Sequence, residues 1–231
     1  MKTVLAVVAV LFMSISVQSQ DWLSGLKLRS YAIPARPVYF KYFGANNRMI
    51  YLDFKEGLSL PCTTDQNTSA KDSTAKKSQI EFFSGKQWQL ADNIQPDLGY
   101  IPTHQNIHNW TEMITIQRLD AQGQKAQKLY NDLVKIREEN CPGKSQFEII
   151  ESSKNSLIYK VSSEQCEEFE PQTALSIIIT PPKLTIGQYT IWRIEYTIKE
   201  ANQFDKFTPE VISWFKSIEL LTGKSLKDYT E

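Results

Sequence analysis

Glycine and histidine are scarce in this chain of 231 residues, which contains 9 glycines and 2 histidines. The sequence has no glycine-rich phosphate-binding loop, no dinucleotide-binding fingerprint and no Gly-x-Ser-x-Gly nucleophile turn. Net charge is also lacking, because 26 basic residues balance 26 acidic ones, and this argues against nucleic acid as a partner. We therefore expect no cofactor, no nucleic acid, and a partner that is a protein or a small ligand.

Long apolar runs are absent after the first residues of the chain. At the N-terminus, Lys2 is followed by an apolar run from Val4 to Met13 and by small residues up to Ser19, which is typical of a secretory signal peptide. A run of about ten apolar residues is too short to cross a bilayer as a helix, which disfavours the alternative of a membrane anchor. The sequence predicts a signal peptide over residues 1–19 and an exported product, periplasmic or secreted, with no transmembrane segment.

The three cysteines are Cys62, Cys141 and Cys166, so at least one is unpaired within a monomer. Outside the cytoplasm cysteines meet an oxidising environment in which disulfides form. Cys141 follows a predicted helix and Cys166 follows the second predicted strand after it, an arrangement that favours this pair. Cys62 would then be a buried thiol or a link to another chain; a catalytic cysteine is a further alternative, although no histidine lies near Cys62 in the sequence.

Hydrophobic periodicity divides the mature chain into a strand-rich N-terminal block (20–62), a polar loop or linker (63–78) and a main α+β domain (79–231). In the block, Val38 to Phe43 and Met49 to Phe54 are rich in aromatic and branched residues and predict two strands. After the linker, 80–83 and 88–90 predict a hairpin, and Thr111 to Arg118 alternates as a half-buried strand does.

Two amphipathic helices frame four further strands in the main domain. Apolar residues recur at helical spacing from Ala126 until Cys141-Pro142-Gly143 ends the pattern. A final helix is predicted to begin with Thr208 as N-cap and Pro209 at the first position, and to end at Gly223. Its apolar stripe consists of Val211, Trp214, Phe215, Ile218 and Leu221, and the strands between the helices cover 147–151, 157–161, 175–180 and 189–199. This order predicts an α+β fold, cystatin-like or related, in which a helix packs on an antiparallel meander.

Several short motifs occur in a familiar order along the main domain: Asn109-Trp110-Thr111-Glu112, Cys141-Pro142-Gly143, Leu157-Ile158-Tyr159 with Cys166, and 194–199. Together they resemble exported proteins of unknown function from Gram-negative bacteria, most closely a group from legionellae linked with type II secretion. The resemblance covers roughly residues 79–200. It implies a cystatin-like or related fold, a cystine between residues 141 and 166, and no known activity.

Two candidate sites lie just before and within the alternating strand. His104, His108 and Glu112 are spaced by four, so on a helix they would share one face and could ligate zinc. Pro102, two asparagines and the strand pattern from Thr111 argue against a helix, so solvent-facing histidines in a loop are the alternative. Trp110 lies among polar residues and is a candidate contact for a partner, although a place in the core is the simpler expectation.

No set of residues converges on a recognisable reaction. A cystatin-type inhibitor would carry a Gln-x-Val-x-Gly hairpin and a downstream Pro-Trp pair, and neither is present. The sequence therefore favours an exported non-enzymatic binding module. The alternative is a hydrolase or metal-dependent enzyme whose site is assembled from distant residues.

Overall fold

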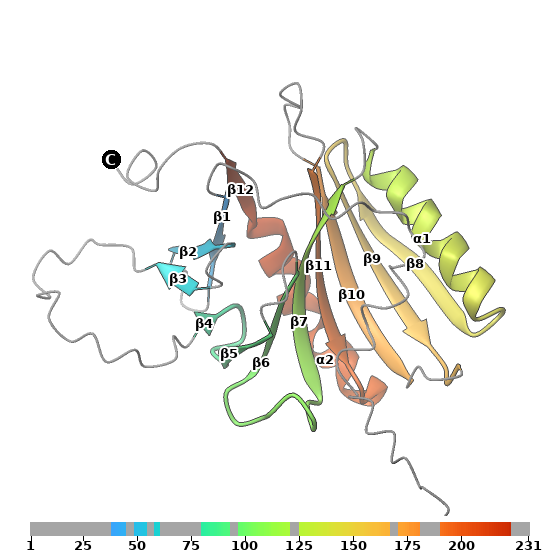
Figure 1. Cartoon of the computed structure of the whole chain (residues 1–231), viewed down its shortest axis with the longest axis horizontal. Helices are drawn as coiled ribbons and strands as arrows, with labels where there is room; N and C mark the ends of the chain where they lie inside the picture. Colours follow the sequence, from blue (N-terminus) through green and yellow to red (C-terminus); the bar gives the residue numbers. More distant parts are fainter. Residues whose placement is uncertain are drawn as a thin grey trace, which may run out of the picture.

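The computed structural model describes residues 38–44, 49–54, 58–60, 80–92, 97–120, 125–166, 171–180 and 190–222 (Figure 1). The predicted signal peptide, the polar loop and Cys62 lie outside these ranges. Within them the chain is an α+β protein made mostly of antiparallel strands with two helices. No helix in these ranges is both long enough and apolar enough to cross a membrane.

The larger of two sheets has eight antiparallel strands in the order β4-β5-β6-β7-β11-β10-β9-β8. The predicted meander is confirmed, because the last four strands of this sheet are sequence neighbours paired side by side. In this sheet β6 was not predicted from the sequence, and neither was β3 of the smaller sheet. The bounds are β4 (Ile80–Glu81), β5 (Gln87–Asp92), β6 (Asp97–Pro102), β7 (Glu112–Asp120), β8 (Ser145–Ser152), β9 (Ser156–Ser163), β10 (Gln172–Ile179) and β11 (Thr190–Ile198).

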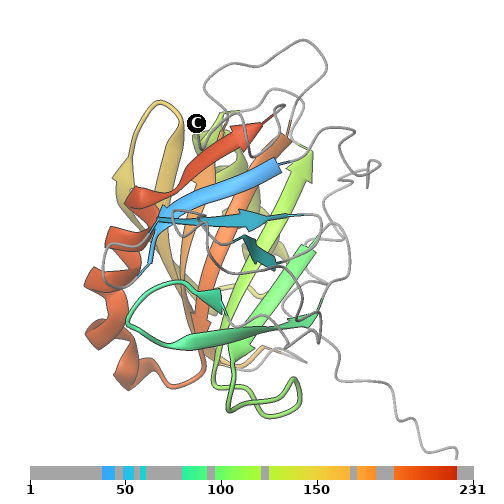
Figure 2. The same ribbon diagram turned by 90° about the vertical axis from the view of Figure 1, so that its left-hand side faces the viewer.

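The smaller sheet joins the two ends of the described chain. Its order is β12-β1-β2-β3, with β12 (Glu219–Thr222), β1 (Val38–Phe43), β2 (Met49–Asp53) and β3 (Leu58–Leu60). Figure 2 shows its strands crossing in front of those of the large sheet. Aromatic side chains from both sheets meet between them; Trp192 of β11, for example, has ring centroids 5.0 Å from Phe40 and 4.5 Å from Phe54. The predicted N-terminal block and main domain thus share one core.

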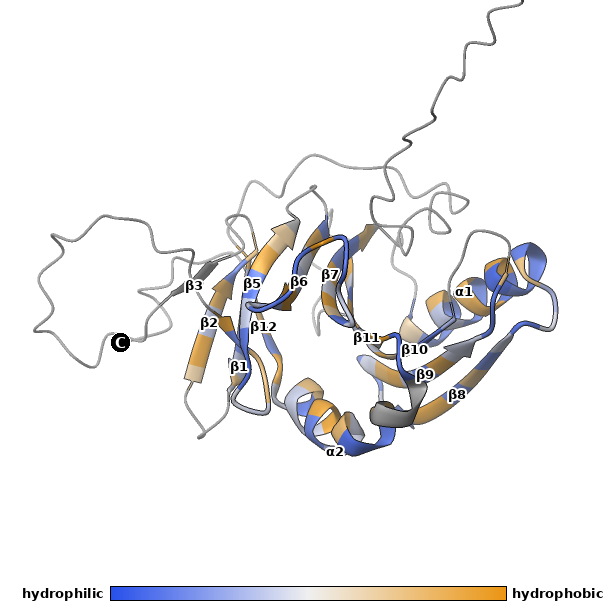
Figure 3. Ribbon diagram, turned by 90° about the horizontal axis from the view of Figure 1, so that it is seen from below, coloured by the Kyte–Doolittle hydropathy of each residue, from blue (hydrophilic) through white to orange (hydrophobic). Residues whose placement is uncertain are grey.

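The two helices lie on opposite faces of the large sheet (Figure 3). Helix α1 (Ala126–Asn140) packs against β8, β9 and β10, with Leu129, Tyr130 and Leu133 buried. It ends where the sequence predicts, because Pro142 cannot supply the next amide hydrogen. Helix α2 (Ala201–Ser217) packs against β1, β10 and β11 on the other face and completes the aromatic core with Trp214 and Phe215.

The predicted start of the last helix is wrong. Helix α2 begins at Ala201, with Pro209 inside it, and the Thr208 hydroxyl donates to the Phe204 carbonyl at 3.0 Å instead of capping the helix. A proline inside a helix costs about 3 kcal/mol. The extra turns bury Phe204 completely, which offsets most of that cost because burying a large apolar side chain contributes about 1.5–3 kcal/mol.

The predicted end of that helix is also wrong. The helix stops at Ser217, Ile218 has an extended backbone, and Leu221 faces Tyr39 of β1 as part of strand β12. Two of the five residues assigned to the helical stripe, Ile218 and Leu221, therefore lie outside the helix. Residues 219–222 form a strand instead of continuing the helix, because the strand pairs with β1 while Leu221 stays buried.

Strand β7 lies deeper than its alternation suggests. Ile114 and Ile116 face the aromatic core, as expected, but Thr115 and Gln117 on the other face are buried as well. The prediction of a half-buried strand is wrong, because β7 lies inside the sheet between β6 and β11 and both of its faces are covered.

Candidate functional site

The predicted metal ligands are not brought together. His104 and His108 are exposed in the turn after β6. There the Asn106 side chain accepts a hydrogen bond from the His108 backbone amide, and the Asn109 side chain accepts one from the Asn106 backbone amide. The segment is therefore not a helix, and spacing by four places no two of these side chains on one face. Across the part of the chain that the structure describes, no three histidine, cysteine, aspartate or glutamate side chains are placed to hold a metal ion.

Glu112 instead belongs to a buried cluster beside α2. Both of its carboxylate oxygens lie 2.8 Å from the Lys86 ammonium, and the Tyr196 hydroxyl donates to it at 2.9 Å. The Lys86 ammonium also lies 4.0 Å from the centre of the Phe207 ring. Burial and the neighbouring Glu112 carboxylate raise the pKa of Tyr196 well above its usual range. These contacts tie β7, β11, α2 and the β4–β5 connection together.

Trp110 lies half-buried at the end of the same turn. The Lys199 ammonium lies 4.6 Å from the centre of its ring, and the Lys199 amide donates to the Thr111 carbonyl at 3.0 Å. Trp110 therefore belongs neither to the aromatic core nor to the fully exposed surface. A cation stacked on a tryptophan face stabilises the end of β11.

The predicted disulfide between Cys141 and Cys166 is confirmed, with their Cα atoms 5.9 Å apart. Cys141 is the residue after α1, and Cys166 lies three residues after β9. The bond therefore holds the end of α1 to the sheet that the helix covers.

A second buried polar cluster lies on the α1 face of the large sheet and was missed by sequence reasoning. Arg193 and Glu195 of β11 form an ion pair with side chains only 2% and 8% exposed. Ser176 of β10 donates to the Glu195 carboxylate at 2.7 Å, and Arg193 donates to the Gln117 side-chain oxygen Oε1 at 3.1 Å. The sequence signal for this cluster is the alternation in β11, where Arg193 and Glu195 alternate with Trp192, Ile194 and Tyr196 of the aromatic core.

A cavity of about 20 Å³ lies beside this cluster, and its walls include Arg137, Tyr159, Arg193 and Glu195. The Tyr159 hydroxyl is buried without a hydrogen-bond partner of acceptable geometry, and its burial raises its pKa. Burial disfavours the charge on Arg193, but the interactions with Glu195 and Tyr159 together outweigh burial and raise the pKa of the guanidinium. The cavity has room for one water molecule and is too small for an organic substrate.

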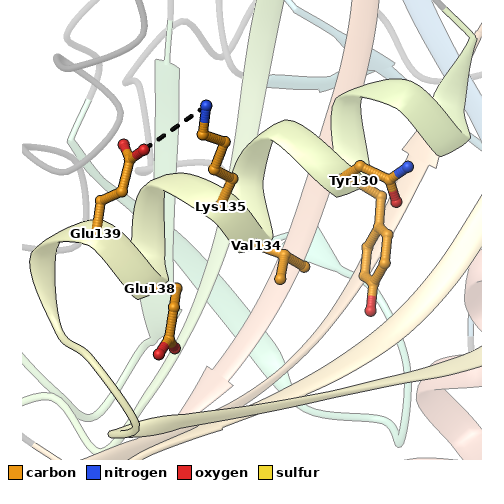
Figure 4. Close-up of a pocket in the computed structure, with 6 residues that line it drawn as sticks. Tyr130, Val134, Lys135, Glu138 and Glu139 are labelled. Atoms are coloured by element: carbon orange, nitrogen blue, oxygen red, sulfur yellow. Dashed lines mark ion pairs between the residues drawn. The ribbon is translucent and has the colours of Figure 1, made fainter.

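An open groove of about 500 Å³ runs along α1 on the outside of the molecule (Figure 4). Tyr130, Val134 and Glu138 point to the same side of the helix, and an ion pair between Lys135 and Glu139, 3.7 Å apart, lies on the other side. The Tyr130 ring meets the Phe147 ring of β8 edge to face, with centroids 6.2 Å apart. Residues of α1 line the groove, and Phe147 brings strand β8 next to it.

Among the residues that the structure describes, strand β8 forms one edge of the large sheet and pairs with β9 alone. Its Ile149 and Ile150 are 42% and 37% exposed, and the only other large apolar side chain exposed to this degree among the described residues is Phe43 of β1. The ladder with β9 shifts register between Ile149 and Glu151. We call the groove along α1 together with Phe147, Ile149 and Ile150 of β8 the α1–β8 surface.

Comparisons with known proteins add little to this geometry. No protein-family model matches the chain, and no curated protein matches it. The crystal structure of the Ran-binding protein Mog1p from Saccharomyces cerevisiae aligns with 58% of this chain and 88% of its own length, at 9% sequence identity and a TM-score of 0.37. A similarity this weak carries no argument about fold or function.

Proposed function

We propose that this protein is an exported, non-enzymatic interaction module that binds another protein through the α1–β8 surface. The observation that carries the proposal is the contrast between its polar clusters and this surface. The Arg193–Glu195 ion pair is buried, and the Glu112 carboxylate is already held by Lys86 and Tyr196. The α1–β8 surface is open and combines apolar side chains with the edge of a sheet.

Two features support export to the periplasm or beyond. Residues 1–19 have the composition of a signal peptide. The disulfide between Cys141 and Cys166 suits an oxidising compartment. Both agree with the resemblance to exported bacterial proteins linked with type II secretion, and on this proposal the chain acts after leaving the cytoplasm.

The proposed scaffold is cystatin-like in its central part. Helix α1 is followed directly by β8, β9, β10 and β11 as antiparallel neighbours, and α1 packs across one face of them. On this proposal β4–β7 are additions that extend the sheet beyond β11, and the small sheet and α2 are additions that cover the face opposite α1. The scaffold serves binding and not protease inhibition, because the inhibitory motifs are missing from the sequence.

Site-specific photo-crosslinking in the producing cell tests the proposal. A photoreactive phenylalanine analogue placed at Val134 or Ile149 should give a discrete protein adduct outside the cytoplasm, and the same analogue at the exposed Glu210 of α2 should not. Equal adduct yields at all three positions would refute binding through this surface. A mature product that stays in the cytoplasm with residues 1–19 attached would refute export.

A further inference from the structure

We infer that the α1–β8 surface binds an extended peptide segment that adds to the large sheet as a strand beside β8, with alternating apolar and basic side chains. The inference rests on the proposed function and names the kind of partner that this surface recognises. Three independent properties of the surface lead to it: the direction of the free backbone groups, the shape of the groove and the charge around it.

Alternate residues of β8 direct their backbone N–H and C=O groups away from β9, toward the side where the described chain places no further strand. The Glu164 amide donates to the Lys144 carbonyl at 2.9 Å, so Lys144, Gln146 and Glu148 direct their backbone groups toward β9. Phe147 and Ile149 therefore direct theirs away from the sheet. The register shift after Ile149 ends this regular stretch, so the edge offers a short template covering residues 145–149.

The groove determines which side chains suit one face of the added strand. Phe147 and Ile149 lie on the face of β8 that α1 covers, and the Phe147 ring contacts Tyr130. An added strand would lie about 4.8 Å beyond β8, so alternate side chains would enter the groove beside Val134. Because Tyr130 and Val134 present apolar groups there, those alternate positions favour apolar residues.

The charge on β8 determines which side chains suit the other face of the added strand. Strand β8 carries Glu148 and Glu151 and no basic residue. Glu151 is paired with Lys216 of α2 at 2.6 Å, and Glu138 of α1 accepts the Gly143 amide at 3.0 Å, so the carboxylate that an added strand would meet is Glu148. Glu148 is exposed on the face of β8 that points away from α1, where the alternate side chains of an added strand would pass. Basic side chains at those positions would therefore face a carboxylate.

The same charges disfavour a second copy of this chain as the occupant. Two β8 strands paired about a two-fold axis at residue 148 would set the Glu148 carboxylates of both copies opposite each other, with no basic residue in either strand. Like charges facing each other across a strand pair are destabilising. A basic, apolar segment of another protein meets the edge without that penalty.

Binding of synthetic peptides to the full mature protein tests the inference. The probe is a fluorescein-labelled peptide in which lysine and valine alternate, and its binding is followed by fluorescence anisotropy. Two control peptides are matched to it: one places all the lysines before all the valines, and the other replaces lysine with glutamate. We expect binding of the alternating lysine peptide that is about tenfold or more tighter than binding of either control.

A charge-reversal variant of β8 provides a second test of the inference. Glu148→Lys should weaken binding of the alternating peptide about five- to tenfold, whereas Glu210→Lys, the same change at an exposed position of α2, should leave it unchanged. Both side chains are exposed, so both variants should fold, as an unchanged melting temperature would verify.

Three results would overturn the inference. One is equal binding of the block-ordered peptide, another is unchanged binding by Glu148→Lys, and the third is a dimer in sedimentation that Ile149→Lys dissociates. If none of the peptides binds while crosslinks still form specifically at Val134 and Ile149, the proposed function stands and only the inference of strand addition is refuted.

Discussion

The two faces of the large sheet are stabilised by different means. On the face covered by α2 and the small sheet, aromatic rings contact one another continuously, as Phe40, Phe54 and Trp192 do. On the face covered by α1, the core formed with the helix lies beside a buried ion pair, a small cavity and an open groove. Strand β11 supplies residues to both faces, with Ile194 in the aromatic core and Ile191 in the core under α1. The comparison teaches that alternation assigns residues to a face but does not say what covers that face.

The largest expected effect is on the aromatic face. Trp192→Ala removes a fully buried ring that touches Phe40 and Phe54, so the free energy of unfolding should fall by about 3–5 kcal/mol. Urea unfolding followed by circular dichroism measures the change. A loss below about 1 kcal/mol would mean that the two sheets do not share a core.

The ion pair on the α1 face should show strong coupling. Glu195→Leu leaves the Arg193 guanidinium buried without the carboxylate that faces it, which should cost about 3–5 kcal/mol. Adding Arg193→Met in the same chain should recover most of that loss, because two apolar side chains can replace a buried pair. Additive losses in a double-mutant cycle would contradict a paired arrangement.

The disulfide should contribute chiefly to the α1 side of the molecule. Replacing Cys141 and Cys166 together by alanine should lower the free energy of unfolding by about 3 kcal/mol, as expected for a loop of 25 residues. Hydrogen exchange should then accelerate in α1 more than in α2. Equal acceleration in both helices would show that the disulfide is not a local clamp.

The smallest effect is expected at the cavity. Tyr159→Phe deletes a buried hydroxyl that lacks a well-placed partner, so the free energy of unfolding should change by less than about 1 kcal/mol. A loss of about 3 kcal/mol would indicate that the hydroxyl holds a water molecule essential to the cluster. Thermal unfolding of the two proteins side by side measures the difference.

The elements predicted correctly are those whose signals are local. The helix before Cys141 and the strands after it follow from periodicity and from Pro142, which acts on its immediate neighbours. The errors lie where distant partners decide the outcome. Burial of Phe204 extends α2 past Pro209, and pairing with β1 turns Leu221 into part of a strand.

The candidate sites also divide into those that local sequence signals predict and those that depend on distant partners. Pairing of Cys141 with Cys166 was predictable because the helix and the strands around it were. The cluster around Arg193 was not, because it needs Ser176 and Gln117 from two other strands whose register no local signal gives. The α1–β8 surface also depends on knowing that β8 lies at an edge of the sheet, which only the strand order reveals.

Hydrogen exchange at single residues of β8 tests the central claim most directly. In the free protein the amides of Gln146 and Glu148 should exchange slowly and those of Phe147 and Ile149 rapidly. Addition of the peptide with alternating lysine and valine should slow Phe147 and Ile149 selectively. Unchanged exchange at Phe147 and Ile149 under saturating peptide would contradict strand addition at this edge.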